Sequence, residues 1–265
     1  MAIILGKKIY GRLETLEYAN KKFQWSDMYF IGISCFYGFW AWLLARLTHR
    51  KCIYYCIDFY SPEIADNLWD SIFIWSAMKM DKFLCKHCDK VWDISKNINK
   101  GREVFENTIC LSDIVPLSYP SSYFRYIHGD KNKIVFVGIE PYGLELLDNY
   151  VWLRGLPLDK LLDELSKSGI GIALWKRNGN NYYGDPGKTK LYSACGLPVI
   201  TTPNTEYAKI IEKTNAGIVV EYDRKQVAKA IRKIIKNYSY YKRNVKKTWK
   251  YIDAKRIFGN KKLLE

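Results

Sequence analysis

The hydrophobic positions of this 265-residue chain fall into short apolar runs that alternate with longer segments of helical periodicity. Tyr29 to Ser34 and Cys52 to Ile57 are apolar runs of strand length. The segments that follow them, Phe36 to His49 and Ile64 to Lys86, carry apolar residues at helical spacing. This alternation predicts strands that are buried on both faces and joined by helical crossovers, as in a parallel α/β sheet.

The rest of the first half continues this pattern less clearly. Asp89 to Ser95 and Thr108 to Leu111 are predicted strands, and a short polar helix is predicted between them at Ile98 to Phe105. Residues 1–27 are polar and mixed, and the sequence places no element there. Asp58 follows a predicted strand, where a carboxylate either contacts a ligand at the sheet edge or caps the next helix. The sequence leaves both roles open.

The composition turns to Pro, Ser, Tyr and Gly after residue 115, and a second α/β pattern begins at Lys133. Further strands are predicted at Tyr150 to Arg154, Ile170 to Trp175, Leu197 to Thr202 and Gly217 to Glu221. We therefore predict an α/β fold with two abbreviated Rossmann-like parallel-sheet domains. The predicted division is an N-terminal domain (1–115), a linker (116–132), a C-terminal domain (133–222) and basic helices (223–265).

The most informative stretch lies between two predicted strands of the second domain, at residues 183–202. Asp185 can cap a helix, Pro186 suits its first turn, and Gly196 is a natural stop. The unpaired N–H groups and partial positive charge of a helix N-terminus favour a phosphate. Lys188 adds a full positive charge in the first turn, so the sequence predicts an anion site here.

The order Gly-Asp-Pro-x-Lys-x-x-x-Tyr-x-x-Cys-Gly-x-Pro-Val-Ile, over residues 184–200, resembles the donor-site segment of retaining GT-B glycosyltransferases of the group 1, or family four, type. The alternative is a generic α/β unit whose Gly and Pro serve only as turn residues. The resemblance implies transfer of a hexosyl or related group from a nucleotide sugar to a hydroxyl acceptor. That acceptor would be a glycan or a lipid-linked glycan, in surface polysaccharide or glycoconjugate synthesis. No metal or other cofactor is implied.

The resemblance also implies roles for single residues. Lys188 and the helix N-terminus around Gly187 and Thr189 would bind the diphosphate, and Gly184 would allow close backbone approach. Asp185 would accept hydrogen bonds from sugar hydroxyls or simply cap the helix. Asp185 and Lys188 are the two candidates for a catalytic role.

Three further positions complete the predicted donor site. Gly138 and Gly155 end predicted strands and would border the base and ribose. Tyr192 would pack beside the nucleotide, with an ordinary core tyrosine as the alternative. Lys190, two residues after the candidate lysine, is expected on the surface.

The chain departs from the family pattern in two places. No glycine-rich strand–loop–helix is recognisable before Tyr29, and one βα unit with its basic loop is missing within 138–150. That loop usually neutralises the leaving diphosphate, so Lys176 or Arg177 would have to substitute. Leu191 stands where many relatives carry an acid. A second hypothesis is therefore a non-catalytic GT-B-like subunit, or a truncated product, that docks on a transferase or a membrane.

The net charge of +15 is concentrated near the C-terminus. Residues 224–262 hold 15 Lys or Arg against one acid, a net charge of +14. A solvated helical face explains this charge, and so does attraction to an anionic membrane surface, where lipid-linked acceptors reside. Nucleic acid is an unlikely partner because no binding signature accompanies the charge. We expect a cytoplasmic protein that is peripheral on the inner face of the membrane.

The remaining chemistry-bearing residues add little. The seven cysteines lie mostly in apolar runs, as in reduced cytoplasmic proteins, and Cys85 and Cys88 lack a second ligand pair for a metal. His128 is interpreted as a surface histidine of the linker. No secretory signal is visible. Met28 to Ala45 is uncharged over 18 residues, which fits a short membrane span or a strand followed by a helix, and the α/β pattern favours the second.

Overall fold

The computed structural model describes residues 3–5, 12–23, 29–126, 129–138, 143–176, 180–185, 187–259 and 263. Met28, His128 and Arg177 lie outside these residues. The chain forms two compact units, the first from 1–117, 178–185 and 254–265, the second from 118–177 and 186–253. The sequence predicted one passage from domain to domain through a linker at 116–132. The return of two short segments to the first unit depends on contacts between residues far apart in the chain.

The first unit is built on a sheet of five parallel strands in the order β1-β2-β3-β4-β5. The strands are β1 (Ile3–Leu5), β2 (Tyr29–Ile33), β3 (Lys51–Cys56), β4 (Lys90–Asp93) and β5 (Asp113–Ile114). The side chains of β2 are buried throughout, and those of β3 are buried except for Lys51. Burial on both faces explains the continuous apolar runs that the sequence shows there.

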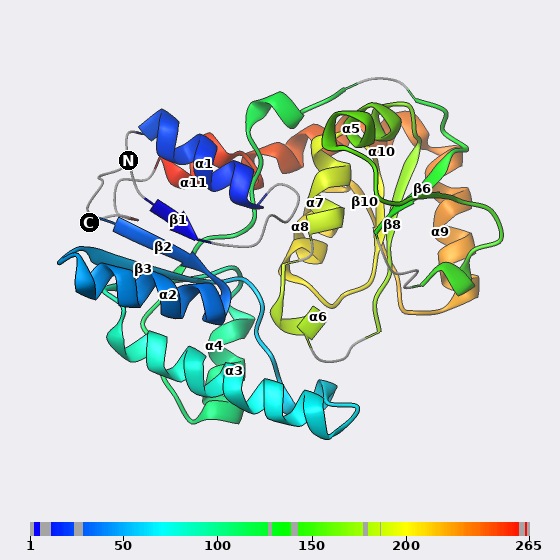
Figure 1. The fold of residues 1–265 in the computed structure, drawn as a ribbon. Helices are drawn as coiled ribbons and strands as arrows, with labels where there is room; N and C mark the ends of the chain where they lie inside the picture. Colours follow the sequence, from blue (N-terminus) through cyan, green and yellow to red (C-terminus); the bar gives the residue numbers. More distant parts are fainter. Residues whose placement is uncertain are drawn as a thin grey trace. The chain divides into compact units, whose positions relative to one another are not determined.

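Helices cover both faces of this sheet (Figure 1). The helices α2 (Ser34–Leu47) and α3 (Leu68–His87) lie on one face, and α1 (Arg12–Phe23) and α11 (Ala254–Phe258) lie on the other. Shorter elements are η1 (Pro62–Ile64), α4 (Asn97–Gly101), η2 (Arg102–Glu106) and α6 (Asn180–Tyr183). The helix predicted at 98–105 is confirmed as α4 and η2.

One prediction for the first unit is wrong, and two points that the sequence left open are decided. Strand β1 and helix α1 precede Tyr29, where the sequence placed no element. The strand after β4 is Asp113–Ile114, because the apolar residues Ile109 and Leu111 of the predicted strand point to solvent. Asp58 caps no helix, since α3 begins at Leu68 and Asn67 accepts the capping hydrogen bond from Asp70 N–H.

The second unit contains another sheet of five parallel strands, in the order β10-β9-β8-β6-β7. The strands are β6 (Ile134–Val137), β7 (Val151–Leu153), β8 (Ile170–Ala173), β9 (Val199–Thr201) and β10 (Gly217–Val219). The chain runs from β6 to its neighbour β7, then crosses to the opposite side of β6 to form β8. The strand order therefore reverses between β6 and β8, and such a point is where open α/β sheets bind ligands.

The helices of the second unit are α5 (Leu158–Ser166), α7 (Gly187–Ala194), α8 (Glu206–Thr214), α9 (Arg224–Lys236) and α10 (Tyr238–Val245), with short turns η3 (Ser121–Tyr123), η4 (Leu144–Leu146) and η5 (Lys246–Tyr251). The predicted cap of α9 is confirmed, because Asp223 Oδ1 accepts a hydrogen bond from Gln226 N–H at 2.8 Å. Between β6 and β7, the described residues contain the turn η4 and no further strand, in agreement with the predicted loss of a βα unit.

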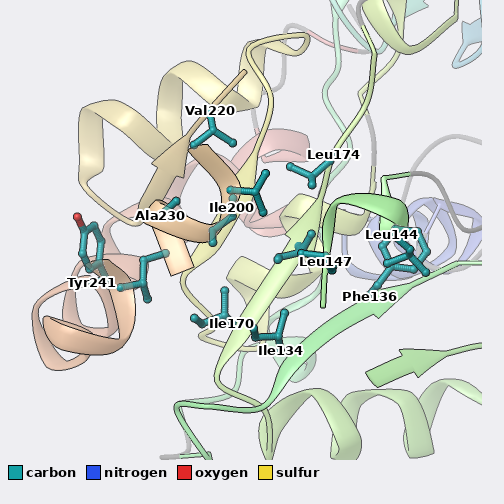
Figure 2. Close-up of a cluster of buried hydrophobic side chains, with 13 residues drawn as sticks. Ile134, Phe136, Leu144, Leu147, Ile170, Leu174, Ile200, Val220, Ala230 and Tyr241 are labelled. Atoms are coloured by element: carbon teal, nitrogen blue, oxygen red, sulfur yellow. The ribbon is translucent and has the colours of Figure 1, made fainter. Parts of the chain in front are cut away.

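A cluster of buried apolar side chains joins the second sheet to α9 and α10 (Figure 2). Ile134, Ile170 and Ile200 come from β6, β8 and β9, at positions that face the cluster. Helix α9 contributes Val227 and Ile234, which are fully buried. The apolar residues of α9 recur at helical spacing, so one face packs on the sheet and the cations remain outside.

Residues 29–45 form strand β2 and most of helix α2, so the alternative of a strand followed by a helix is confirmed for them. Within the described residues, no helix has both the length and the apolar composition needed to cross a membrane.

Candidate functional site

Helix α7 is buried along almost its whole length. From Thr189 to Ala194 every side chain is buried, and Lys188 is the one side chain of the helix that is partly exposed. Both ends of the helix are fixed within the second unit, since Tyr119 Oη donates to Gly187 O at 3.0 Å and Trp249 Nε1 donates to Ser193 O at 2.8 Å. The structure therefore presents a single lysine from a rigid helix N-terminus.

Lys188 reaches the carboxyl end of β6. Its ammonium lies 4.4 Å from the centre of the Phe136 ring, and a methyl group added to Gly138 would lie 2.7 Å from Nζ. Gly138 has a φ of +155°, which side chains rarely tolerate. Lys188, the α7 N-terminus and Gly138 thus meet where the strand order reverses. The sequence predicted Lys188 and this helix N-terminus for an anion site and Gly138 for the border of the base and ribose, and these binding roles stay predictions.

A tryptophan and an arginine beside Gly138 were missed by the sequence analysis. Trp152 Nε1 donates a hydrogen bond to Gly138 O at 2.7 Å. The Arg154 guanidinium lies over the Trp152 ring, 5.5 Å from its centre, and is exposed. Arg154 is therefore a second cation at this sheet edge. Its signal in the sequence was a basic residue at the C-terminal end of a predicted strand.

Tyr192 is a core residue and not a ligand contact. Its side chain is fully buried, its hydroxyl accepts from Val137 N–H at 2.8 Å, and it donates to Ile172 O at 3.1 Å. Burial raises the pKa of this tyrosine above its ordinary value. The tyrosine links α7 to β6 and β8, so its predicted place beside the nucleotide is wrong and the core alternative is correct.

Replacing Tyr192 by phenylalanine should lower the free energy of unfolding by about 1–3 kcal/mol, because it leaves the Val137 N–H without this acceptor. Urea unfolding would measure the loss. Binding of an anionic ligand at Lys188 should be unchanged, since the hydroxyl faces the interior of the sheet. A selective loss of ligand affinity in a stable variant would contradict the core role.

The remaining residues that the sequence predicted near the donor site belong partly to the second unit and partly to the first. Gly155 has a φ of +65°, and a methyl group added to it would meet no described atom beyond its chain neighbours within 4 Å, so there is open space at the end of β7. Lys190 is not on the surface as expected, because it is buried with its ammonium 5.4 Å from the centre of the Tyr207 ring. The Lys176 ammonium lies 5.5 Å from the centre of the Tyr222 ring.

Gly184 and Asp185 belong to the first unit. Asp185 is buried, and its Oδ2 accepts a hydrogen bond from Leu117 N–H at 3.0 Å. The same segment is held by Ser95, which donates to Tyr183 O, and by Asn97, which donates to Tyr182 O at 2.8 Å. The carboxylate of Asp185 thus supports the backbone where β5 leads out of the first unit. Its predicted bonds to sugar hydroxyls stay a prediction.

The first unit also contains a buried ionic cluster at the carboxyl side of its sheet. Arg102, fully buried, donates to Asp81 from Nε at 2.7 Å and to Asp93 from Nη1 at 2.8 Å. Burial disfavours the charged form of Asp81, but Arg102 outweighs it and lowers the pKa of that carboxyl. Tyr54 adds a hydrogen bond to Asp81 at 2.5 Å. The cluster ties α3, β3, β4 and η2 together.

Glu106 lies at the edge of this cluster. It lines a shallow surface depression together with Asp58, Tyr60 and Asp81. Burial and the nearby Asp81 carboxylate raise the pKa of Glu106 to about 9. Glu106 is therefore protonated in the folded protein at neutral pH, whereas in the unfolded chain it is ionised above about pH 4.3.

Glu106 should consequently lower the free energy of unfolding as the pH rises. Between the pKa values of the unfolded and folded states, the folded protein keeps a proton that the unfolded chain releases. This difference lowers the free energy of unfolding by about 1.4 kcal/mol per pH unit. A Glu106→Gln variant lacks this titration, so its stability relative to wild type should increase from about pH 5 to about pH 9. Urea unfolding at several pH values would measure the difference. Glu103→Gln, an exposed change on the same helix η2, is the control. Equal slopes for wild type and Glu106→Gln would contradict the assignment.

The cysteines of the Cys85-Lys-His-Cys88 segment contact different partners. Cys88 Sγ lies 3.3 Å from Cys52 Sγ, and Cys85 Sγ lies 3.7 Å from Asp81 Oδ2. In the described part of the chain, no group of three or more His, Cys, Asp or Glu side chains is placed to hold a metal ion.

Comparison with solved structures identifies the fold. A sucrose-phosphate synthase from Thermosynechococcus elongatus matches with a TM-score of 0.66 at 14% identity, over 95% of this chain and 76% of that chain. The Anabaena protein HepE, solved with UDP-glucose, matches with a TM-score of 0.68 at 9% identity, over 92% and 79% of the two chains. WaaG, a glycosyltransferase involved in lipopolysaccharide biosynthesis, gives a TM-score of 0.58 at 13% identity, over 83% and 79%.

The two parallel α/β sheets have the fold of GT-B glycosyltransferases. The profile of the glucosyltransferase 3-like family, C-terminal domain, matches residues 120–263, which is more than half of the sequence. The chain belongs to the glucosyltransferase 3-like family. No curated protein matches the sequence. The predicted resemblance to GT-B glycosyltransferases is confirmed.

Proposed function

We propose that this protein transfers a hexosyl or related group from a nucleotide sugar to a hydroxyl of a glycan or lipid-linked acceptor, with retention of configuration at the anomeric carbon. The observation that carries the proposal is the position of Lys188, presented by the rigid N-terminus of α7 against Gly138 at the reversal of strand order. HepE, a protein of the same fold, was solved with UDP-glucose, which supports a UDP-sugar as the first donor to test.

In this reaction the bond between the anomeric carbon and a diphosphate oxygen breaks, and a bond to the acceptor oxygen forms while the acceptor hydroxyl passes its proton to the leaving diphosphate. Negative charge grows on the leaving diphosphate. Lys188 and the N–H groups of Gly187 and Thr189 would stabilise that charge from fixed positions. Arg154 would supply the positive charge that the missing basic loop usually provides to the leaving diphosphate. Two cations and a helix N-terminus supply enough positive charge for the proposal to need no metal.

The acceptor and setting follow from the same proposal. A surface polysaccharide or glycoconjugate pathway would place the acceptor at the cytoplasmic face of the membrane. The basic stretch 224–262 supports attraction to an anionic membrane surface, because α9 keeps the cations Arg224, Lys225, Lys229 and Arg232 exposed.

The direct test is binding and slow hydrolysis of a panel of UDP-, GDP- and dTDP-sugars by the folded protein. Saturable binding of one donor, with release of its nucleoside diphosphate, is the expected result. An α-linked sugar released from an α-linked donor, seen by NMR, would support retention. No binding of any donor by a protein with intact secondary structure would overturn the proposal and favour the non-catalytic subunit.

A further inference from the structure

Helix α2 is apolar on every side. Its buried stripe of Cys35, Gly38, Ala41 and Ala45 packs toward β2 and β3. The opposite side carries exposed apolar side chains at 36, 37, 40, 44 and 47, and Arg46 is the one charged residue in the helix. A helix that is apolar all round normally has a second apolar environment besides the core. Among the described residues of the first unit, none covers the second side of α2 at these exposed positions.

Helix α3 extends this surface. Its first half exposes apolar side chains at 68, 69, 72, 73 and 75, with Trp69 exposed by 78% and Leu68 by 73%. The rings of Phe36 and Phe73 lie 5.4 Å apart, so the exposed side chains of the two helices are continuous. We call this surface the aromatic face; its members are Phe36, Tyr37, Trp40, Leu44, Leu47, Leu68, Trp69, Ile72, Phe73 and Trp75. A continuous patch of ten large apolar side chains is typical of a binding surface, whereas single exposed apolar residues are common on any protein.

The charges around the aromatic face indicate its partner. The exposed cations of α2 and α3 include Arg46, Lys79 and Lys86. The Lys79 ammonium lies 5.6 Å from the centre of the Trp75 ring, and Arg46 bonds the carbonyl of His87 at 2.8 Å, which brings the C-terminal ends of the helices together. Of the two acids in these helices, Asp81 is buried in the ionic cluster, and Asp70 lies in the first turn of α3, where the exposed Glu63 and Asp66 precede the helix. The cations therefore lie toward the C-terminal ends of the two helices.

We propose that the aromatic face of α2 and α3 binds the surface of an anionic lipid bilayer. Tryptophan and tyrosine combine an apolar ring with a polar tip, which suits the headgroup boundary, and neighbouring cations attract anionic headgroups. Six of the ten members are aromatic, which fits this boundary better than an aliphatic patch would. A second copy of the chain fits less well, because the same cations would face each other across a symmetric interface.

The experiment is flotation of the full chain with vesicles of phosphatidylcholine alone and with an equal mixture of phosphatidylcholine and phosphatidylglycerol. Binding should be stronger to the mixture and weaker at high salt. Substituting Trp40→Ser and Trp69→Ser together, one on each helix, should reduce binding to the mixed vesicles about 10-fold or more. The matched control, Ile109→Ser with Leu111→Ser, removes two exposed apolar side chains of the same unit outside the face and should bind as wild type does.

If the serine variant loses its secondary structure, Trp40→Phe with Trp69→Phe tests the same surface. With bromine-labelled phospholipid in the mixed vesicles, quenching of tryptophan emission should then be weaker than in wild type. Three results would overturn the proposal: unchanged binding by a folded serine variant, binding lost only with Lys225→Ser and Lys229→Ser in α9, or a wild-type dimer that the serine variant converts to monomer. The last would assign the face to a second copy of the chain.

Discussion

Replacing Arg102 by alanine should lower the free energy of unfolding by about 3–5 kcal/mol, because it leaves two buried carboxylates without their shared cation. Arg102 bridges Asp81 and Asp93, and Asp93 is completely buried. Some of the loss should be recovered at acid pH, where the two carboxyls take up protons and no longer carry unpaired charge. Urea unfolding followed by circular dichroism at neutral and acid pH would measure both effects.

The control is an arginine–aspartate pair at the surface. Arg224 bonds Asp148 at 2.7 Å, but both side chains are largely exposed. Since exposed pairs contribute at most about 1 kcal/mol, Arg224→Ala should change stability far less than Arg102→Ala. Similar losses in the two variants would show that burial of the Arg102 cluster does not set its energetic importance.

Replacing Lys188 by alanine should reduce sugar transfer or donor hydrolysis about 10²–10³-fold in kcat, the usual cost of removing a fixed group that stabilises developing charge. Donor affinity should also fall, since the ammonium meets the diphosphate in the ground state. Stability should change little, because Lys188 is partly exposed and lies outside the packed part of α7. Steady-state kinetics with the donor found in the panel, alongside thermal unfolding, would measure these effects.

Lys209→Ala is the matched control, because Lys209 is an exposed lysine on α8 of the same unit. It should keep wild-type activity. Full activity in Lys188→Ala would remove the lysine from the proposed mechanism, even if donor binding by wild type upheld the rest. Arg154→Ala should weaken donor binding by a smaller factor, since its guanidinium is exposed and screened by solvent.

Much of the second unit could be predicted from local pattern. The strands at 134–137, 170–173 and 199–201 are short apolar runs, and α9 has a cap and a clear helical period. These signals are strong because a strand buried on both faces must be apolar throughout, whereas a helix on the sheet needs only one apolar stripe. The hydrophobic pattern did not locate strand β5, because that strand has only two residues and buries few side chains.

The candidate site was predicted in part. Lys188, Gly187 and Gly138 were assigned correctly to one end of a parallel sheet, because chain order and strand direction together fix which loops lie there. The surface placement of Lys190 was wrong, and for Tyr192 the sequence left a role beside the nucleotide and a core role open. The position of a residue along a helix determines the direction in which its side chain points. Whether that side chain contacts solvent or another element depends on the tertiary structure of the unit. In α7 both positions meet other elements, and neither faces solvent.

The sequence by itself determined the alternation of strands and helices, the helix start near Lys188 and the accumulation of cations after residue 223, since each is a property of neighbouring residues. The tertiary structure alone decided that Arg102 joins Asp81 and Asp93, that Arg154 and Trp152 stand beside Gly138, and that ten apolar side chains of α2 and α3 share one exposed surface. The physical reason is that burial and ion pairing join residues that are distant in the chain. Their free energies arise only when the sheets are formed and the helices are packed on them.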